Sequence, residues 1–208
     1  MMQTQHPTVL TIAGVDPSGG AGILADIKTM SSLGAYATGV VTAVTAQNTV
    51  GVQGALPIPT DFVVRQIDTL FEDVHIDSVK IGMLFDSNLI RAIAERLRYW
   101  KPRFIVLDPV MVAKSGDALL TREAISTLRE ELLPISTIIT PNLPEAAELL
   151  QAVDITDDDQ MEEAANDLWK MKGCTGWVYL KGGHQENVDH SMDLLYDGRH
   201  MIRYSAER

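Results

Sequence analysis

The sequence has very few cysteines and no long apolar run, and each deficit excludes a class of protein. Cys174 is the single cysteine among 208 residues, so the chain cannot form an internal disulfide or a zinc site built from thiolates, which is typical of a reducing compartment. No apolar stretch approaches the roughly 18 residues of a membrane span, and residues 1–9 lack the basic and apolar regions of a secretory signal. We therefore expect a cytoplasmic protein with no membrane partner.

Positive charge is also scarce. The chain has 17 Lys and Arg against 28 Asp and Glu, a formal net charge of −11, which argues against a nucleic-acid partner because such binding depends on a basic surface. Seven of the carboxylates fall between Gln151 and Trp169, where there is no Lys or Arg. The pattern favours an acid-rich helix start, complementing the helix dipole, over a metal site.

What the sequence does contain is an alternation of apolar, β-branched runs with amphipathic segments of helix length. Near-continuous apolar strands separated by helices are typical of a mostly parallel sheet covered by helices on both faces. Strands are predicted at 8–14, 38–48, 78–84, 104–110, 137–140 and 176–183, and helices at about 21–33, 61–71, 87–100, 121–133 and 143–150, followed by the acidic helix. An Asp-Gly turn within 192–205 predicts a hairpin. No linker or repeat is present, so we expect one α/β domain over 1–208.

Most of the glycines and unusual polar residues follow the predicted strands. In open parallel sheets, ligands bind beyond the carboxyl ends of the strands. The strand-exit loops, which we expect to form one cleft, are 14–22, 45–53, 81–86, 108–117, 140–145 and 181–184.

The loop GVDPSGGAG (14–22) is the richest in glycine and leads into a helix. It is not a P-loop, because no Lys-Ser or Lys-Thr follows Gly22. The stretch GAGILA (20–25) matches a dinucleotide fingerprint, but the acid expected about 20 residues later is missing, since residues 27–60 contain no Asp or Glu. The glycines therefore indicate close approach of backbone to a ligand. Asp26, about one turn inside the helix, is either a ligand residue or an acid complementing the helix dipole.

Taken together, TIAGVDPSGGAGILADIKT, GAYATGVVTAVTAQNTVGVQG, KIGML, VLDPVMVAKSGD, ITPNLPEAAELL and KGGH resemble the hydroxymethylpyrimidine and phosphomethylpyrimidine kinases of thiamine biosynthesis. The resemblance runs from about Val9 to about Ser205 and includes all six loops in order. It implies a three-layer, ribokinase-like α/β fold. It also implies ATP-dependent phosphorylation of 4-amino-5-hydroxymethyl-2-methylpyrimidine and then of its monophosphate, with Mg²⁺ as cofactor and a homodimeric assembly.

By similarity, five strand-exit residues and one residue of the first helix, Asp26, would contact the flat aminopyrimidine; the strand-exit residues are Gly14, Thr45, Gln47, Met83 and Val110. The amide of Gln47 carries both a donor and an acceptor for the ring nitrogen and the exocyclic amine. Met83 and Val110 would sandwich the ring, although simple core packing would explain the same two residues.

A second set would serve the nucleotide. Asn142 and Glu145 match the N-x-x-E motif of the superfamily, in which the Glu organises Mg²⁺, but the same spacing also caps a helix. By similarity Asp108 would belong to the metal shell and Lys181 would lie near the phosphates, an arrangement that suits phosphoryl transfer. The segment VAKSGDALL (112–120), with Lys114, Gly116 and Asp117, is a candidate flap over the site, and His184 has no assigned role.

The sequence departs from the family pattern at its end. The family has an anion-hole motif after the last hairpin, with the candidate catalytic base as its final residue, and Arg208 comes before that point. We expect the catalytic base to lie beyond Arg208, in a longer polypeptide. Two alternatives stay open: a pyridoxal or pyridoxine kinase, and a non-catalytic pyrimidine-binding module.

Overall fold

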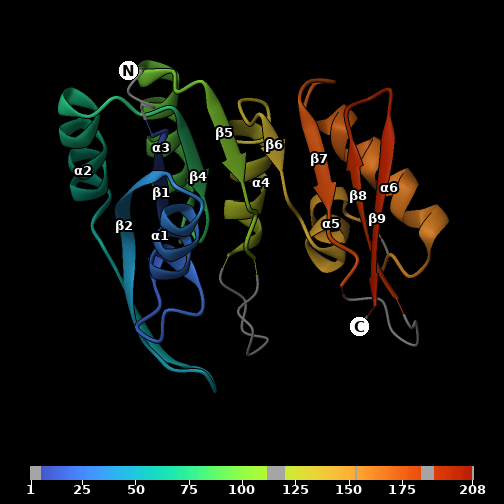
Figure 1. Cartoon of the computed structure of the whole chain (residues 1–208), viewed down its shortest axis with the longest axis horizontal. Helices are drawn as coiled ribbons and strands as arrows, with labels where there is room; N and C mark the ends of the chain where they lie inside the picture. Colours follow the sequence, from blue (N-terminus) through green and yellow to red (C-terminus); the bar gives the residue numbers. More distant parts are fainter. Residues whose placement is uncertain (1–5, 112–119, 153, 184–189, 208) are drawn as a thin grey trace.

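The computed structural model describes residues 6–111, 120–152, 154–183 and 190–207, in which nine strands form one sheet (Figure 1). The strand order is β3-β2-β1-β4-β5-β6-β7-β8-β9. The pairs β2/β3, β7/β8 and β8/β9 are antiparallel and the other pairs are parallel, which confirms the predicted mostly parallel sheet. The strands are β1 Thr8–Val15, β2 Tyr36–Gln47, β3 Val52–Pro57, β4 Ser78–Ile81, β5 Phe104–Leu107, β6 Ile138–Ile139, β7 Trp177–Leu180, β8 His190–Tyr196 and β9 Met201–Glu207.

Six helices connect these strands: α1 Gly22–Ser32, α2 Thr60–Asp73, α3 Ser87–Trp100, α4 Arg122–Glu131, α5 Leu143–Leu150 and α6 Asp158–Met171. Several begin where a side chain accepts a hydrogen bond from the first turn, as Asp86 does from Leu89 and Asp157 from Gln160. Asp158 and Asp159 lie in the first turn of α6, so the acid-rich segment is a helix start as predicted.

The helices lie on both faces of the sheet, which confirms the three-layer arrangement. Alternate strand residues face opposite sides. Val79 and Ile81 of β4 are buried in the core that α2, α3, α4 and α6 share, whereas Lys80 between them contacts α1 on the other face. On that second face, Phe104 of β5 is 42% exposed and Tyr204 of β9 is 49% exposed.

One element was not predicted. The segment 45–53 was expected to be a strand-exit loop, but its end belongs to β3, which pairs antiparallel with β2. Five of the six residues of β3 are exposed, so the strand has no buried face to impose the alternation that predicts strands. The Asp-Gly hairpin between β8 and β9 is confirmed, with Asp197 accepting bonds from the N–H groups of Arg199 and His200.

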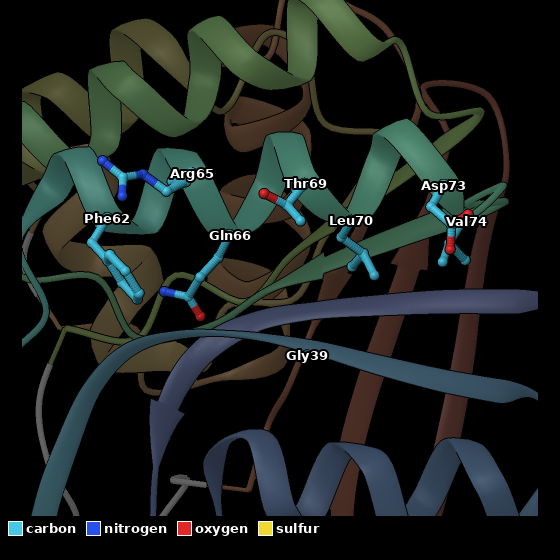
Figure 2. Close-up of a pocket in the computed structure, with 8 residues that line it drawn as sticks. All are labelled: Gly39, Phe62, Arg65, Gln66, Thr69, Leu70, Asp73 and Val74. Atoms are coloured by element: carbon cyan, nitrogen blue, oxygen red, sulfur yellow. The ribbon is translucent and has the colours of Figure 1, made fainter.

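The strand-exit loops gather at a single edge of the sheet, the lower edge in Figure 1. Residues 112–119 of the predicted flap and His184 lie outside the described residues. A separate groove runs between α2 and the outer edge of β2 (Figure 2). There the side-chain amide of Gln66 pairs with both the N–H and the C=O of Val41, in place of a neighbouring strand. Within the described chain, every helix is too short or too polar to cross a bilayer.

Candidate active site

The glycine loop is organised around the buried carboxylate of Asp16. This carboxylate accepts hydrogen bonds from the backbone N–H groups of Ser18, Gly20 and Ala21 and from the Ser18 hydroxyl. Burial by itself would raise the pKa of Asp16, but these bonds outweigh burial and lower the pKa below its ordinary value. The loop is thus a fixed turn built on an ionised carboxylate.

Gly22 makes this turn possible. Its φ is +58°, and a Cβ placed there would lie 2.2 Å from the carbonyl oxygen of Gly14. Any side chain would therefore push the start of α1 away from the end of β1. At Gly22 the close approach is between two stretches of this chain's own backbone, and it brings α1 against β1; the predicted approach to a ligand stays a prediction.

Gly14 also lies against Met83, which follows β4. A Cβ on Gly14 would lie 2.4 Å from the Met83 methyl carbon, so the missing side chain leaves room for the thioether. The Met83 carbonyl accepts a hydrogen bond of 3.0 Å from the Thr42 hydroxyl on β2. Two of the predicted pyrimidine residues, from different strand exits, are therefore in contact.

Thr45 and Gln47 meet at the end of β2. The Thr45 hydroxyl lies 2.8 Å from the carbonyl oxygen of Val15 and 3.2 Å from Oε1 of Gln47. This pairing holds the Gln47 side chain beside the exit of β1. Val110 follows β5, and its N–H donates to the carbonyl oxygen of Asp108 at 2.8 Å.

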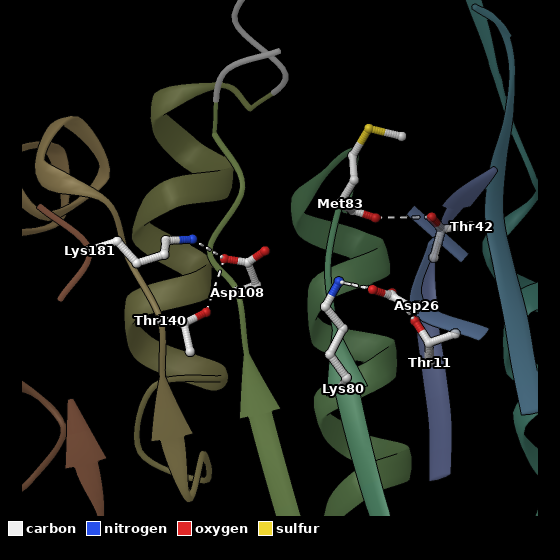
Figure 3. A network of polar contacts seen from close by, with 8 residues as sticks. All are labelled: Thr11, Asp26, Thr42, Lys80, Met83, Asp108, Thr140 and Lys181. Atoms are coloured by element: carbon white, nitrogen blue, oxygen red, sulfur yellow. Dashed lines mark hydrogen bonds and ion pairs between the residues drawn. The ribbon is translucent and has the colours of Figure 1, made fainter. Parts of the chain in front are cut away.

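Asp26 lies inside α1 as predicted, and its carboxylate turns toward the sheet (Figure 3). Oδ2 accepts a bond of 2.6 Å from the Thr11 hydroxyl on β1 and lies 2.9 Å from Nζ of Lys80 on β4. Its side chain is 17% exposed and that of Lys80 is 20% exposed. Asp26 is therefore more than an acid at a helix start, because it is paired across two strands.

Asp108 forms a second cluster of the same composition at the exits of β5, β6 and β7 (Figure 3). Its Oδ1 lies 3.0 Å from both the Thr140 hydroxyl and Nζ of Lys181. Asp108 and Lys181, predicted separately for the nucleotide side, are thus joined directly, 73 positions apart in the chain.

Asn142 and Glu145 cap the start of α5, next to this cluster. Asn142 Oδ1 accepts from the Glu145 N–H at 2.9 Å, and Glu145 Oε2 accepts from the Asn142 N–H at 2.8 Å. Glu145 is buried, and this burial is the main reason that its pKa is raised; the charge of Asp108 adds to the effect, while the Asn142 N–H and the charge of Lys181 oppose it. The predicted cap is present, and the Glu145 carboxylate lies close enough to Asp108 and Lys181 to feel both charges.

The donors on this side fit Mg²⁺. The ion prefers oxygen ligands and is commonly held by one or two carboxylates together with substrate phosphates. Asp108 and Glu145 supply such a pair, and a divalent cation would offset the repulsion that helps to raise the Glu145 pKa. Among the described residues, no group of three or more His, Cys, Asp or Glu could hold a metal without such help from a substrate.

Sequence reasoning missed three members of these clusters: Thr11, Lys80 and Thr140. A signal for Lys80 was available, because a lysine inside the apolar strand SVKI needs a charged partner. Nothing comparable marks Thr11 or Thr140, since threonine is an ordinary strand residue.

Residues 16–208 match the family model of phosphomethylpyrimidine kinase. The chain belongs to the phosphomethylpyrimidine kinase family. It is 51% identical over 199 residues to the hydroxymethylpyrimidine/phosphomethylpyrimidine kinase of Escherichia coli strain K12, a match that covers 96% of this chain and 74% of the relative.

Two solved structures show how far the family resemblance extends in three dimensions. The phosphomethylpyrimidine kinase of Clostridium difficile 630 superposes with a TM-score of 0.86 at 40% identity, over 95% of this chain and 84% of the other. An ADP complex of Bacillus subtilis pyridoxal kinase gives 0.87 at 34% identity, over 98% and 76%. The fold is therefore the ribokinase-like fold that the motifs implied.

Proposed function

We propose that this chain phosphorylates 4-amino-5-hydroxymethyl-2-methylpyrimidine and then its monophosphate, using ATP, in thiamine biosynthesis. The observation that carries the proposal is the 51% identity to a kinase of this activity across 96% of the chain. In the first step the hydroxymethyl oxygen bonds to the γ-phosphorus, the bond from that phosphorus to the β–γ bridging oxygen breaks, and the hydroxyl proton is released. In the second step an oxygen of the monophosphate attacks in the same way.

The pyrimidine is assigned to the exits of β1, β2, β4 and β5. Gly14 and Met83 already touch there, and the Thr45 hydroxyl holds the Gln47 amide oxygen beside Val15; the amide nitrogen would donate to a ring acceptor. Val110 and Met83 follow neighbouring strands and would flank the ring. Asp26 would support this site from α1.

The nucleotide is assigned to the exits of β5, β6 and β7, beside Asn142. Lys181 places one positive charge there, which suits a site for phosphates. Asp108 and Glu145 would hold Mg²⁺, and the ion, when bound, neutralises charge on the phosphate oxygens. A relative with the same fold was solved as an ADP complex, which supports the use of an adenine nucleotide by this fold.

The direct test is pyrimidine-dependent ADP release from ATP by the native full-length protein, run beside calorimetric binding of the same pyrimidine. We expect turnover with the pyrimidine and with its monophosphate, and turnover that stops when EDTA removes Mg²⁺. Binding without turnover would instead support a non-catalytic pyrimidine-binding module. If the protein shows no binding of the pyrimidine and no turnover, the proposed function is refuted.

Pyridoxal kinase is the second candidate, because pyridoxal is also a flat heteroaromatic alcohol and a pyridoxal kinase superposes at a TM-score of 0.87. A competition assay between pyridoxine and the hydroxymethylpyrimidine separates the two. We expect the pyrimidine to have the higher kcat/KM. Comparable values would overturn that ranking.

We also propose that the chain is a homodimer. The β2–β3 hairpin extends beyond the rest of the sheet edge and exposes apolar side chains, with Val50 at 91% and Leu56 at 66% exposure. Sedimentation equilibrium should give twice the chain mass. A monomer at micromolar concentration would contradict the proposal.

A further inference from the structure

Lys80 directs its ammonium group at a single carboxylate. Nζ lies 2.9 Å from Oδ2 and 3.2 Å from Oδ1 of Asp26. The fully buried Thr11 adds its hydroxyl to the same Oδ2 at 2.6 Å. A lysine that is largely shielded from water is rarely found without a charged partner, and the Asp26 carboxylate is the partner of Lys80 within its strand.

These contacts fasten α1 to the sheet. The helix buries one residue, Ile23, whereas α3 on the opposite face buries six. Ile23 and Ile27 pack α1 against Gly39 of β2. However, α1 buries fewer side chains than α3, so the charged contact between Asp26 and Lys80 is a larger share of what holds α1.

The fastened helix is also the one that carries the glycine loop. Asp26 lies one turn after Gly22, whose Cα approaches the Gly14 carbonyl too closely to allow a side chain. On the other side of the ion pair, a Cβ on Gly82 would lie 3.0 Å from Nζ of Lys80 and 3.2 Å from Cβ of Ala13. Met83 comes next in the chain. Lys80 thus lies between the two strand exits whose residues, Gly14 and Met83, meet in the pyrimidine site.

We propose that Lys80 is a positioning residue of the pyrimidine site. Lys80 holds α1 in place through Asp26, and α1 carries the glycine loop. The pair thereby sets the distance between the glycine loop and Met83, between which the pyrimidine would bind. The inference rests on the proposed function, because it assumes that the pyrimidine binds at these exits. Lys80 itself does not touch the reacting atoms.

Steady-state kinetics of Lys80→Met and Lys80→Arg test the proposal. Lys80→Met should raise the KM for the hydroxymethylpyrimidine about tenfold or more, the loss expected for a charge-assisted hydrogen bond. The KM for ATP should change less than about twofold. Lys80→Arg, which keeps the charge, should restore most of the pyrimidine affinity. An equal rise in both KM values, or no rise, would overturn the proposal.

The matched control is Arg96→Met. Arg96 pairs with Asp68 across α3 and α2 at 3.5 Å, with side chains 23% and 28% exposed, and it lies on helices away from the strand exits. This variant should lower the melting temperature without a change in the KM for the pyrimidine. If Lys80→Met lowers stability by a similar amount and leaves that KM unchanged, its role is structural only.

A double-mutant cycle with Asp26→Asn shows whether Lys80 acts through Asp26. In the Asp26→Asn background, Lys80→Met should change the pyrimidine KM by less than about twofold. If the effects of the two substitutions on the pyrimidine KM are fully additive in free energy, Lys80 does not act through Asp26. If Lys80→Met does not fold, Thr11→Val decides, because it removes one bond to the same carboxylate at nearly constant shape, and an unchanged KM would then refute the proposal.

The same variants separate this inference from the proposed function. If the wild-type chain does not release ADP, the proposed function fails, and the calorimetric Kd for the pyrimidine replaces KM in every comparison above. A wild type that turns over normally, with Lys80→Met indistinguishable from it, would refute the role of Lys80 alone.

Discussion

Two clusters of the same three residue types lie on one sheet and differ in how they are assembled. In one, Asp26 of α1 accepts from Thr11 and Lys80; in the other, Asp108 after β5 accepts from Thr140 and Lys181. The Asp26 carboxylate projects from α1 and contacts residues within two strands, Thr11 of β1 and Lys80 of β4. The Asp108 carboxylate stands at the strand exits themselves.

The difference in position corresponds to a difference in exposure. The Asp26–Lys80 side chains are 17% and 20% exposed, and the Asp108–Lys181 side chains are 24% and 36% exposed. The less exposed pair has both carboxylate oxygens close to its lysine, whereas the more open pair uses one oxygen of Asp108. On the proposed assignment, the less exposed Asp–Thr–Lys cluster would support the pyrimidine site and the more open one would take part in the nucleotide site.

Lys181→Met should produce the largest effect, because it removes the lysine of the open cluster. We expect kcat to fall about 100- to 1,000-fold, as when a preorganised donor to a developing charge is lost. The calorimetric Kd for the pyrimidine should not change. A loss of pyrimidine binding as large as the loss of kcat would mean that the two clusters do not serve separate substrates.

Gln47→Ala tests the other side of the comparison. Loss of a buried polar partner of the pyrimidine should weaken its binding by roughly 2–3 kcal/mol, or about 30- to 150-fold in Kd. The KM for ATP should stay the same. Unchanged pyrimidine affinity would show that the pyrimidine does not bind beside β2.

Gly14→Ala should have a smaller effect on the same site. The added Cβ would displace the Met83 methyl group, which is the end of a flexible side chain, so we expect the pyrimidine KM to rise a few-fold, roughly 1 kcal/mol, with the melting temperature nearly unchanged. Gly22→Ala is the control, because its Cβ would meet backbone at positive φ and should lower stability. Equal melting temperatures for both variants would contradict this geometry.

Lys172 differs from Lys80 and Lys181 because its hydrogen-bond partner is a backbone carbonyl and not a carboxylate. It is 1% exposed, and Nζ donates to the Ser136 carbonyl oxygen at 2.5 Å. Burial lowers the pKa of Lys172 to about 8. As the pH rises through 8, the folded chain releases this proton while the unfolded chain still holds its own, so the cost of the buried charge declines between pH 8 and the pKa of the unfolded chain.

The stability of Lys172→Met relative to wild type should therefore be greatest near pH 7 and fall by roughly 1 kcal/mol between pH 8 and pH 9. Urea denaturation at pH 7, 8, 9 and 10 measures this slope, and any constant offset from the lost hydrogen bond cancels. A difference that is flat with pH would show that Lys172 keeps an ordinary pKa.

Much of this architecture could be predicted from local patterns. The bounds of α3 and α5 agree with the predicted 87–100 and 143–150, because a capping side chain at Asp86 or Asn142 marks each start in the sequence itself. The strand β3 could not be predicted, since it is exposed on both faces and owes its existence to pairing with β2.

The candidate site was only partly predictable for a similar reason. Gly14, Gln47, Met83, Asp108, Glu145 and Lys181 were named by similarity to the kinase family, on motifs that lie at or near the strand ends. Their pairing with Thr11, Lys80 and Thr140 depends on which strands are neighbours, and no local pattern gives that order.

The sequence by itself determined the succession of strands and helices and the common edge at which the strands end. It also determined the tight turn before the first helix, which requires glycine at position 22. Each of these depends on periodicity or backbone conformation within a few residues. Tertiary structure alone decided that Asp26 pairs with Lys80, 54 positions away, and that Asp108 pairs with Lys181, 73 positions away. Those pairs follow from the strand order β1-β4 and β5-β6-β7, which the packing of the whole sheet selects.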